Sequence, residues 1–265
     1  MLFRGTIYSA TLGMETGLTV VGPDGGRTDI PYAAAYVLHG LGGNAASWAD
    51  KTRLPLYAEQ YHTLFFLPEV QRSFYTDMRY GAPFLQYLTE ELPQICENWF
   101  QISRKREDTA VIGGSVGGYG ALKCAFHAPA RFGACAALAP DRLFLGEEMD
   151  EMRQMPREQA ESRWDAALLR DFTAIFGTEL ALCPQDNPLR LAEKAALHGD
   201  APRLLLTCGK QDVRLDDCRH YHEVLGMLGI AHTYIEQDGM HDWYYFDAAL
   251  QQALQWLYGT SSENK

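Results

Sequence analysis

Residues 109–122 read TAVIGGSVGGYGAL, and three local patterns follow one another within them. A short β-branched run ends at glycine, a serine lies between small residues, and an apolar segment with helical spacing continues to Pro129. This order predicts a strand, a sharp turn and a helix. Gly113-x-Ser115-x-Gly117 is typical of a nucleophile elbow, a strained turn that projects the serine hydroxyl above the edge of a sheet. A Cβ at either glycine would collide where the strand and the helix nearly touch.

The same five-residue pattern is also compatible with two other kinds of local structure. It fits a glycine-rich turn that only packs a helix close to a sheet, and it fits a phosphate-binding loop. The flanking strand and helix are the context that an elbow requires, so the elbow is the favoured interpretation.

The composition bounds the class of protein. A chain of 265 residues with 47% hydrophobic content is long enough for one large α/β domain, residues 1–265, with a substantial core. Its 34 acidic and 23 basic residues give a formal charge of −11 without a basic block, which argues against nucleic acid and anionic membranes as partners. The sequence has no apolar run of transmembrane length, and residues 1–7 turn polar too early for a secretory segment, so a cytoplasmic protein is predicted.

The cysteines give no sign of a metal site. All six are scattered, with neither Cys-x-x-Cys nor Cys/His ligand spacing. Reduced thiols in apolar surroundings, with no metal and no disulfide framework, are therefore predicted.

The rest of the chain alternates strands with helices. Two alternating segments, 5–11 and 14–21, predict an antiparallel edge. Further strands are predicted at 33–38, 62–67, 108–112, 132–138, 203–208 and 231–236, and helices at 47–59, 83–100, 215–227 and 242–258. This alternation predicts a mainly parallel sheet with right-handed crossovers and helices on both faces. Only the tail, residues 260–265, is predicted to be disordered.

Residues 141–200 interrupt the alternation. Charged helical stretches mix there with Leu168, Phe172 and Phe176, which predicts a small helical insertion above the sheet. The insertion fits a cap whose apolar underside narrows a substrate entrance. It also fits helices that only cover the flank of the sheet.

Two loops after the early strands are candidates for parts of a site around the serine. Acyl transfer by serine needs two N–H donors for the oxyanion, one from the residue after the nucleophile and one from a glycine-rich loop after an earlier strand. The loop at 39–44, HGLGGN, makes the backbone amides of Val116 and Leu41 the candidates, although an ordinary strand-to-helix turn fits this loop equally. The aromatic loop at 68–77 either walls a substrate site through Tyr75 or packs on the surface.

The serine also needs a base. An unassisted hydroxyl is a poor nucleophile, so a histidine must accept its proton and a carboxylate must orient that histidine. Loops at the carboxyl ends of parallel strands converge at one edge of a sheet. Asp212 follows the strand at 203–208, and His241 follows the strand at 231–236. The order Ser115, Asp212, His241 is the order expected of α/β hydrolases.

Other acidic residues and histidines compete for these roles. Asp216 and Asp217 open the following helix, where carboxylates usually cap free N–H groups, and Asp238 lies too near His241 in the same loop to support its ring. His39 lies in the loop at 39–44, where the simpler interpretation is that it makes a hydrogen bond that stabilises this loop. Five further histidines fit surface or capping positions: His127, His198, His220, His222 and His232.

Five separated segments carry a resemblance to a known family: HGLGGN (39–44), RSFYTDM (72–78), GGSVGGYGAL (113–122), CGKQD (208–212) and GMHDW (239–243). Together they resemble the esterase D branch of the α/β-hydrolase superfamily, especially its bacterial tributyrin esterases and acetyl esterases. The resemblance implies the α/β-hydrolase fold, with Ser115 as nucleophile, His241 as base and Asp212 as its partner. It also implies the Leu41 and Val116 amides as oxyanion-hole donors, and no cofactor.

The same branch contains S-formylglutathione hydrolases, feruloyl esterases and mycolyltransferases. This chain departs from typical S-formylglutathione hydrolases, because Val116 stands where methionine is usual and the cysteine that often follows the oxyanion loop is missing. We therefore expect a serine carboxylesterase that hydrolyses small or short-chain acyl esters through an acyl-enzyme. Tyr75, Tyr119 and Trp243 are its expected pocket walls.

Alternative functions stay open at this point. The sequence also fits a thioesterase acting on S-formylglutathione, a feruloyl (hydroxycinnamoyl) esterase, an acyltransferase, and a binding protein without catalysis. The expected partner is a small-molecule ester, and the sequence is compatible with a homo-oligomer.

Overall fold

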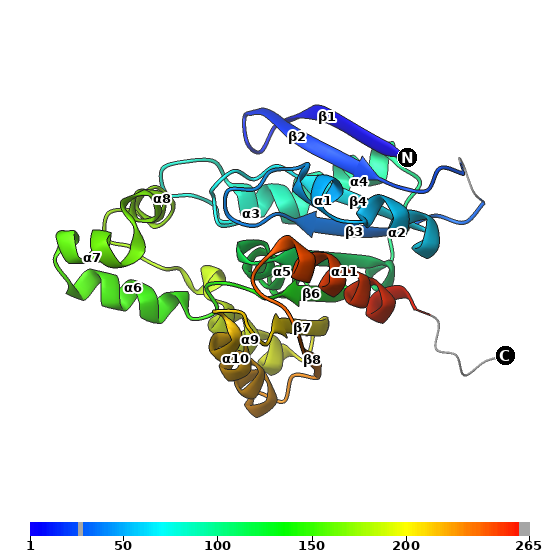
Figure 1. Cartoon of the computed structure of the whole chain (residues 1–265). Coiled ribbons are helices and arrows are strands. Elements are labelled where there is room, and N and C mark those ends of the chain that lie inside the picture. Colours follow the sequence, from blue (N-terminus) through cyan, green and yellow to red (C-terminus); the bar gives the residue numbers. More distant parts are fainter. Residues whose placement is uncertain (26–28, 260–265) are drawn as a thin grey trace.

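The computed structural model describes residues 1–25 and 29–259, so the predicted disorder at 260–265 concerns residues outside the described chain (Figure 1). One eight-stranded sheet has the order β1-β2-β4-β3-β5-β6-β7-β8. Its strands are β1 (Leu2–Ser9), β2 (Met14–Val21), β3 (Ala33–Leu38), β4 (Thr63–Pro68), β5 (Thr109–Gly114), β6 (Ala134–Leu138), β7 (Arg203–Gly209) and β8 (His232–Gln237). The pairs β1–β2 and β2–β4 are antiparallel, and the other neighbours are parallel. The prediction of an α/β fold with a mainly parallel sheet is confirmed.

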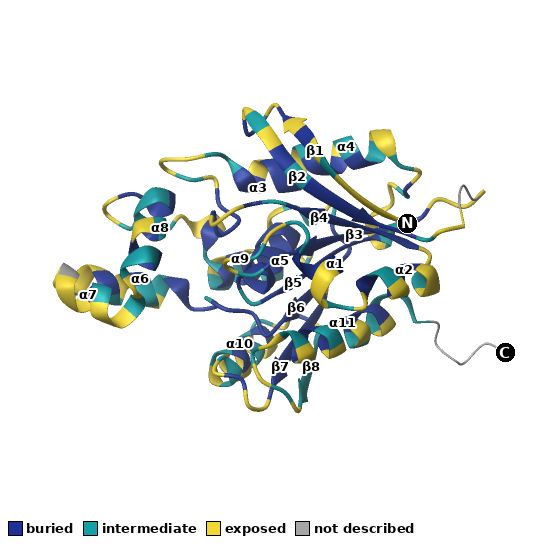
Figure 2. Ribbon diagram, turned by 45° about the horizontal axis from the view of Figure 1, so that its top comes forward, coloured by how far each residue is buried: buried dark blue, intermediate teal, exposed yellow. Residues whose placement is uncertain are grey.

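The central strands are apolar because helices cover both faces of the sheet. β4, β5 and β6 are buried at every position, and Figure 2 shows these strands in dark blue, whereas the edge strand β8 is teal. A Cβ on Gly113 would meet α5 (Val116–His127), whereas a Cβ on its neighbour Gly114 would meet Phe246 of α11 (Trp243–Tyr258). Successive residues of a strand face opposite sides, so α5 and α11 cover opposite faces.

Prolines set where two predicted helices break. The predicted helix at 47–59 divides in two, and Pro55 lies in the first turn of the second part, where its missing N–H needs no acceptor. In the predicted helix at 83–100, Pro93 cannot donate to the carbonyl four residues earlier, and a π-helical turn precedes it. The elements are α1 (Ser47–Lys51), α2 (Leu54–Tyr61), α3 (Phe84–Gln86), η1 (Tyr87–Glu91) and α4 (Leu92–Trp99).

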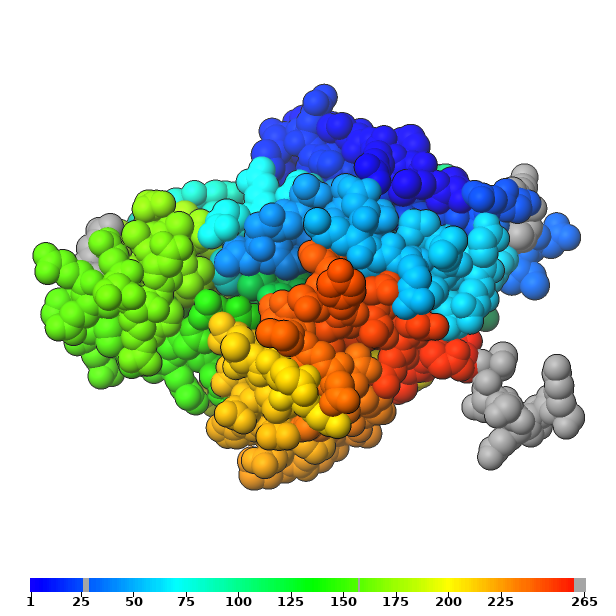
Figure 3. Space-filling model, in the orientation of Figure 1, coloured from blue at the N-terminus to red at the C-terminus, as the bar shows by residue number. Residues whose placement is uncertain are grey.

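The chain leaves the sheet after β6 and returns before β7. Three helices extend beyond one end of the sheet: α6 (Leu145–Gln154), α7 (Arg157–Trp164) and α8 (Ala166–Phe176). In the space-filling view of Figure 3 they form the green projection. The next helix, α9 (Pro188–His198), packs on α5. Within the predicted insertion at 141–200, α9 thus belongs with the sheet-covering helices rather than with the three that extend outward.

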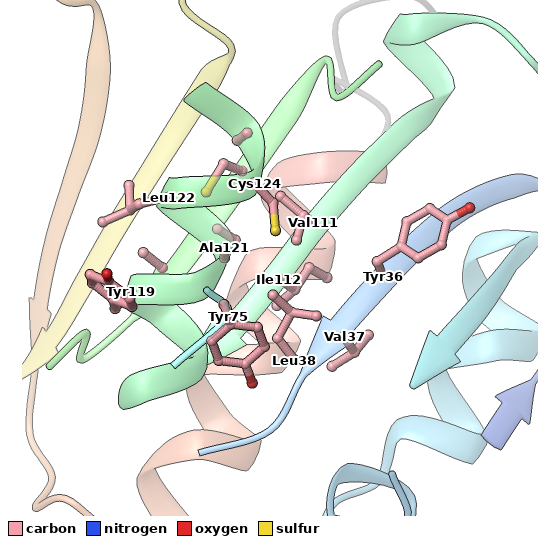
Figure 4. Packing of buried hydrophobic residues seen from close by; sticks show 14 of the residues in the cluster. Tyr36, Val37, Leu38, Tyr75, Val111, Ile112, Tyr119, Ala121, Leu122 and Cys124 are labelled. Atoms are coloured by element: carbon pink, nitrogen blue, oxygen red, sulfur yellow. The ribbon is translucent and has the colours of Figure 1, made fainter. Parts of the chain in front are cut away.

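The core fixes the position of the turn between β5 and α5. Figure 4 shows buried side chains of β3, β5 and α5 in one apolar cluster, among them Leu38, Val111 and Ala121. Close packing on all sides sets the spacing between these elements. Among the helices of residues 1–25 and 29–259, none is long and apolar enough to cross a membrane.

Candidate active site

Ser115 occupies the turn between β5 and α5 in a strained conformation. Its φ is 57° and its ψ is −127°, a backbone conformation that residues with side chains rarely adopt. A Cβ on Gly113 would lie 1.9 Å from the carbonyl oxygen of Gly117, and a Cβ on Gly117 would lie 2.3 Å from the carbonyl oxygen of Leu38. Neither position has room for a side chain. This is the geometry of a nucleophile elbow.

A hydrogen bond joins Asp212 and His241, which follow β7 and β8. His241 Nδ1 lies 2.7 Å from Asp212 Oδ2, and the carboxylate side chain is fully buried. Because a carboxylate only accepts, Nδ1 carries the proton and Nε2 is left as the basic nitrogen. The other carboxylate oxygen accepts a hydrogen bond from the backbone N–H of Arg214 at 2.8 Å. The two loops are also linked directly, since the Gln211 N–H donates to the Gly239 carbonyl at 3.1 Å.

Ser115 and His241 line one cavity, which has a volume of about 200 Å³. Its walls come from widely separated loops: Gly40, Leu41, Trp48, Gly114, Ser115, His241, Asp242, Trp243 and Phe246. The structure therefore brings together the residues that the sequence suggests as nucleophile and base. Trp243, expected as a pocket wall, lies beside them. Of the described residues in the range 141–200, none lines this cavity.

Three aromatic side chains form the apolar part of the cavity. The ring centroids of Trp48 and Trp243 are 5.3 Å apart, those of Trp243 and Phe246 5.9 Å, and those of Trp48 and Phe246 6.1 Å, all in edge-to-face arrangements. The Trp48 indole N–H donates to the Leu38 carbonyl at 2.8 Å, which fixes the ring. Sequence reasoning missed Trp48 and Phe246, because helical spacing assigns both to the core. For Phe246, the available signal was the aromatic run at 243–246, which begins two residues after His241.

The two expected oxyanion donors belong to residues that line this cavity or directly follow one that does. Leu41 lines it, and Val116 follows Ser115 as the first residue of α5. The first N–H groups of a helix have no acceptor within the helix, and they lie at the positive end of its dipole. These positions are compatible with the expected role of the two amides as donors to an oxyanion.

Glu69, at the end of β4, braces the loop that carries Leu41. One carboxylate oxygen accepts the Ala45 N–H at 3.1 Å, and the other lies 3.5 Å from His39 Nε2. Partial burial raises the pKa of Glu69, but hydrogen bonds from His39 and from the amides of Gln71 and Ala45 outweigh this effect, so the net pKa is lowered. The charged form of Glu69 is therefore the form that holds the loop.

Tyr75 and Tyr119, expected as pocket walls, are not among the residues that line the cavity at Ser115. Both side chains are buried, and Figure 4 shows them within the apolar cluster around α5. The Tyr75 hydroxyl donates to the His39 carbonyl, and its ring lies where a Cβ on Gly120 would approach to 2.3 Å. The Tyr119 hydroxyl donates to the Asp186 carbonyl at 2.7 Å. The aromatic loop at 68–77 therefore supports the site from within the protein instead of facing a substrate.

The competing residues lie in other settings. Asp216 and Asp217 occupy the first turn of α10 (Leu215–Met227), where carboxylates favour the helix dipole. Asp238 is exposed. His39 Nδ1 lies 2.9 Å from the Gly40 carbonyl oxygen, as expected for a residue that braces its own loop.

A buried ion pair joins α5 to the segment that follows α8 and leads back toward the sheet. Lys123 Nζ of α5 lies 2.5 Å from Asp186 Oδ1, in the turn η3 (Pro184–Asp186), and 2.6 Å from Thr76 Oγ1. Burial lowers the pKa of Lys123, although the Asp186 carboxylate opposes that shift. The pair was not predicted, because a helical lysine is normally exposed.

The fold and the geometry around Ser115 define the class of this protein as an α/β-hydrolase-like serine hydrolase. The family model described as "Putative esterase" matches residues 9–257, so the chain belongs to this esterase family. It is a carboxylic ester hydrolase.

Individual relatives agree with this family. An acetyl esterase of Caldicellulosiruptor saccharolyticus is 25% identical over 223 residues, which cover 84% of this chain and 82% of that protein. The fluorophosphonate-binding serine hydrolase FphF of Staphylococcus aureus has a TM-score of 0.83 and 26% identity, with 98% of this chain and 99% of that chain covered. The S-formylglutathione hydrolase FrmB of Staphylococcus aureus has a TM-score of 0.79 and 25% identity, with 97% and 98% covered.

Proposed function

We propose that this chain is a serine carboxylesterase that hydrolyses short-chain acyl esters through an acyl-enzyme, with Ser115, His241 and Asp212 as its catalytic residues. One observation carries the proposal: Ser115 and His241 line the same cavity, and His241 Nδ1 lies 2.7 Å from Asp212 Oδ2. Membership of the esterase family supports the same reaction.

Acylation begins with proton transfer. Asp212 accepts the Nδ1–H of His241, so Nε2 is free to take the proton of Ser115 Oγ as that oxygen attacks the ester carbonyl. The buried Asp212 carboxylate then stabilises the imidazolium that forms. The carbonyl oxygen becomes an oxyanion and accepts hydrogen bonds from the Leu41 and Val116 amides.

The remaining steps return the enzyme to its starting state. When the bond between the carbonyl carbon and the alcohol oxygen breaks, His241 Nε2 gives its proton to that oxygen and the alcohol leaves. A water molecule then attacks the acyl-enzyme while His241 accepts one of its protons. Finally Ser115 Oγ takes the proton back as the acid departs.

The cavity supports a short acyl group. Its volume of about 200 Å³ is smaller than that of sites for drug-sized ligands, which span roughly 300 to 1,000 Å³. The rings of Trp48, Trp243 and Phe246 give it apolar walls, which suit an alkyl group. Similarity to an acetyl esterase points the same way.

A second candidate function is hydrolysis of an S-formylglutathione thioester. Similarity to FrmB favours it, and a formyl group is small enough for the cavity. The catalytic steps are the same, except that a thiol leaves in place of the alcohol.

A series of p-nitrophenyl esters tests the proposal. We expect kcat/KM to be highest for acetate and butyrate, and to fall by about tenfold or more at octanoate as the chain outgrows the cavity. Trp243→Ala removes one wall and should shift the maximum to longer chains. A maximum at octanoate in the unchanged protein would contradict a short-chain specificity, and S-formylglutathione in the same panel tests the second candidate.

A further inference from the structure

Exposed apolar side chains accompany the catalytic residues along the chain. Val213 follows Asp212 and is 82% exposed, Met240 precedes His241 and is 61% exposed, and Tyr244 follows Trp243 and is 89% exposed. Leu41, which lines the cavity, is 39% exposed. We call these four residues, Leu41, Val213, Met240 and Tyr244, the apolar rim.

The loops that carry the apolar rim lie together on one face. The 209–213 loop and the 237–241 loop are joined by backbone hydrogen bonds from Lys210 to Gln237 at 2.8 Å and from Gln211 to Gly239 at 3.1 Å. In Figure 3 the orange segment near residue 240 lies between the blue segment near residue 45 and the yellow segment near residue 210. Of the four, Leu41 lines the cavity, and Tyr244 lines a neighbouring hollow that shares Trp243 with it. Single exposed apolar residues are ordinary, but several of them on adjoining loops beside a cavity mark a binding surface.

The cavity is closed on one side and open on the other. Trp48 and Phe246 are buried and form its closed part, whereas Leu41 and His241 are partly exposed. His241 must deliver a proton to the leaving alcohol oxygen, so the alcohol lies on the His241 side. The acyl group then occupies the closed part, and the alcohol extends over the apolar rim.

We propose that the apolar rim binds the alcohol half of the substrate, so that the substrate class is short-chain esters of apolar alcohols. This inference rests on the proposed function. Charge supports it, because Asp242 lines the cavity and the chain carries a formal charge of −11, both of which disfavour an anionic leaving group such as glutathione.

Alkyl acetates that share one acyl group test the rim. Full burial of a methylene corresponds to about fourfold in binding, and a rim covers only one side, so kcat/KM should rise about twofold per methylene from ethyl to pentyl acetate. Pentyl acetate should also be preferred to 2-ethoxyethyl acetate, which has a chain of the same length with one ether oxygen. A flat series, or equal use of these two esters, overturns the inference while leaving the esterase itself intact.

Variants of rim residues, with an exposed methionine elsewhere as the control, test whether the rim causes the gain in kcat/KM per methylene. Met240→Gln combined with Val213→Thr should reduce the gain per methylene by at least half. Met227→Gln is the control, because Met227 is 77% exposed at the end of α10, away from the catalytic loops, and we expect its series to match the unchanged protein. An unreduced gain in the double variant overturns the assignment to these residues.

A pair of thioesters tests the opposite leaving-group chemistry. S-pentyl thioacetate and S-acetylglutathione have the same acyl group and the same bond to be broken. We expect a higher kcat/KM for S-pentyl thioacetate, and a higher value for S-acetylglutathione overturns the inference. Absence of turnover of every ester and thioester by the folded protein overturns the proposed function as well, so the two failures are distinguishable.

Discussion

Asp212 Oδ2 accepts the Nδ1 proton of His241 across 2.7 Å, from a side chain that solvent does not reach. This contact fixes which imidazole nitrogen is basic. In Asp212→Asn the amide can present an N–H to His241, which favours the wrong tautomer, so kcat for p-nitrophenyl acetate should fall by about 10³ to 10⁴-fold. Steady-state kinetics measure this, with circular dichroism to verify folding. A loss of less than about tenfold would exclude the role assigned to Asp212.

Glu69 should affect the rate of the chemical step more than substrate binding. Glu69→Gln weakens the contact with the Ala45 amide and loosens the loop that carries Leu41, so we expect kcat to fall several-fold with little change in KM. A change confined to KM would argue against this positioning role.

The same variant should alter the dependence of stability on pH. The pKa of Glu69 is lower in the folded protein than its ordinary value, so its charge stabilises the fold above about pH 4.3. That contribution is lost as the pH falls through the folded-state pKa. Urea unfolding from pH 3 to pH 7 should therefore show the largest deficit of Glu69→Gln near neutral pH. A deficit that grows on acidification would reverse the assigned sign.

Gly117 is required by a backbone contact. In Gly117→Ala the new Cβ would lie 2.3 Å from the Leu38 carbonyl oxygen, and the free energy of unfolding should drop by about 2 to 3 kcal/mol together with activity. Gly226→Ala is the matched control, because nothing lies within 4 Å of a Cβ there and alanine favours the helix by about 0.5 to 1 kcal/mol. Urea denaturation measures both, and equal effects of the two substitutions would refute the steric argument.

The Lys123–Asp186 pair should be a large contributor to stability. Lys123→Met leaves the Asp186 carboxylate buried without its partner, and breaking a buried pair in this way costs about 3 to 5 kcal/mol in the free energy of unfolding. Adding Asp186→Asn should restore part of the loss, because an amide carries no charge. No recovery in the double variant would show that the pair acts through packing instead.

The sheet and the elbow were predictable because their signals are local. The buried strands are continuous apolar runs, and the glycines around Ser115 report a backbone crowding that depends on immediate neighbours. The loops with Asp212 and His241 could be placed at one edge because parallel strands end there. Their hydrogen bond then follows from the order of the strands in the sheet.

The pocket walls were not predictable in the same way. Phe74 and Tyr75 adopt positive φ values of 49° and 55°, which no neighbouring residue demands, and this turn takes Tyr75 into the core. Lys123 finds its partner in a distant segment that local spacing does not reveal. Such positions depend on tertiary packing, which periodicity along the chain does not encode.

The central claim is that Ser115 is the nucleophile. Its most direct test is steady-state hydrolysis of p-nitrophenyl acetate by Ser115→Ala and by the unchanged protein at equal concentration. The account predicts a folded variant whose kcat is lower by at least about 10³-fold. Comparable turnover by Ser115→Ala would contradict it.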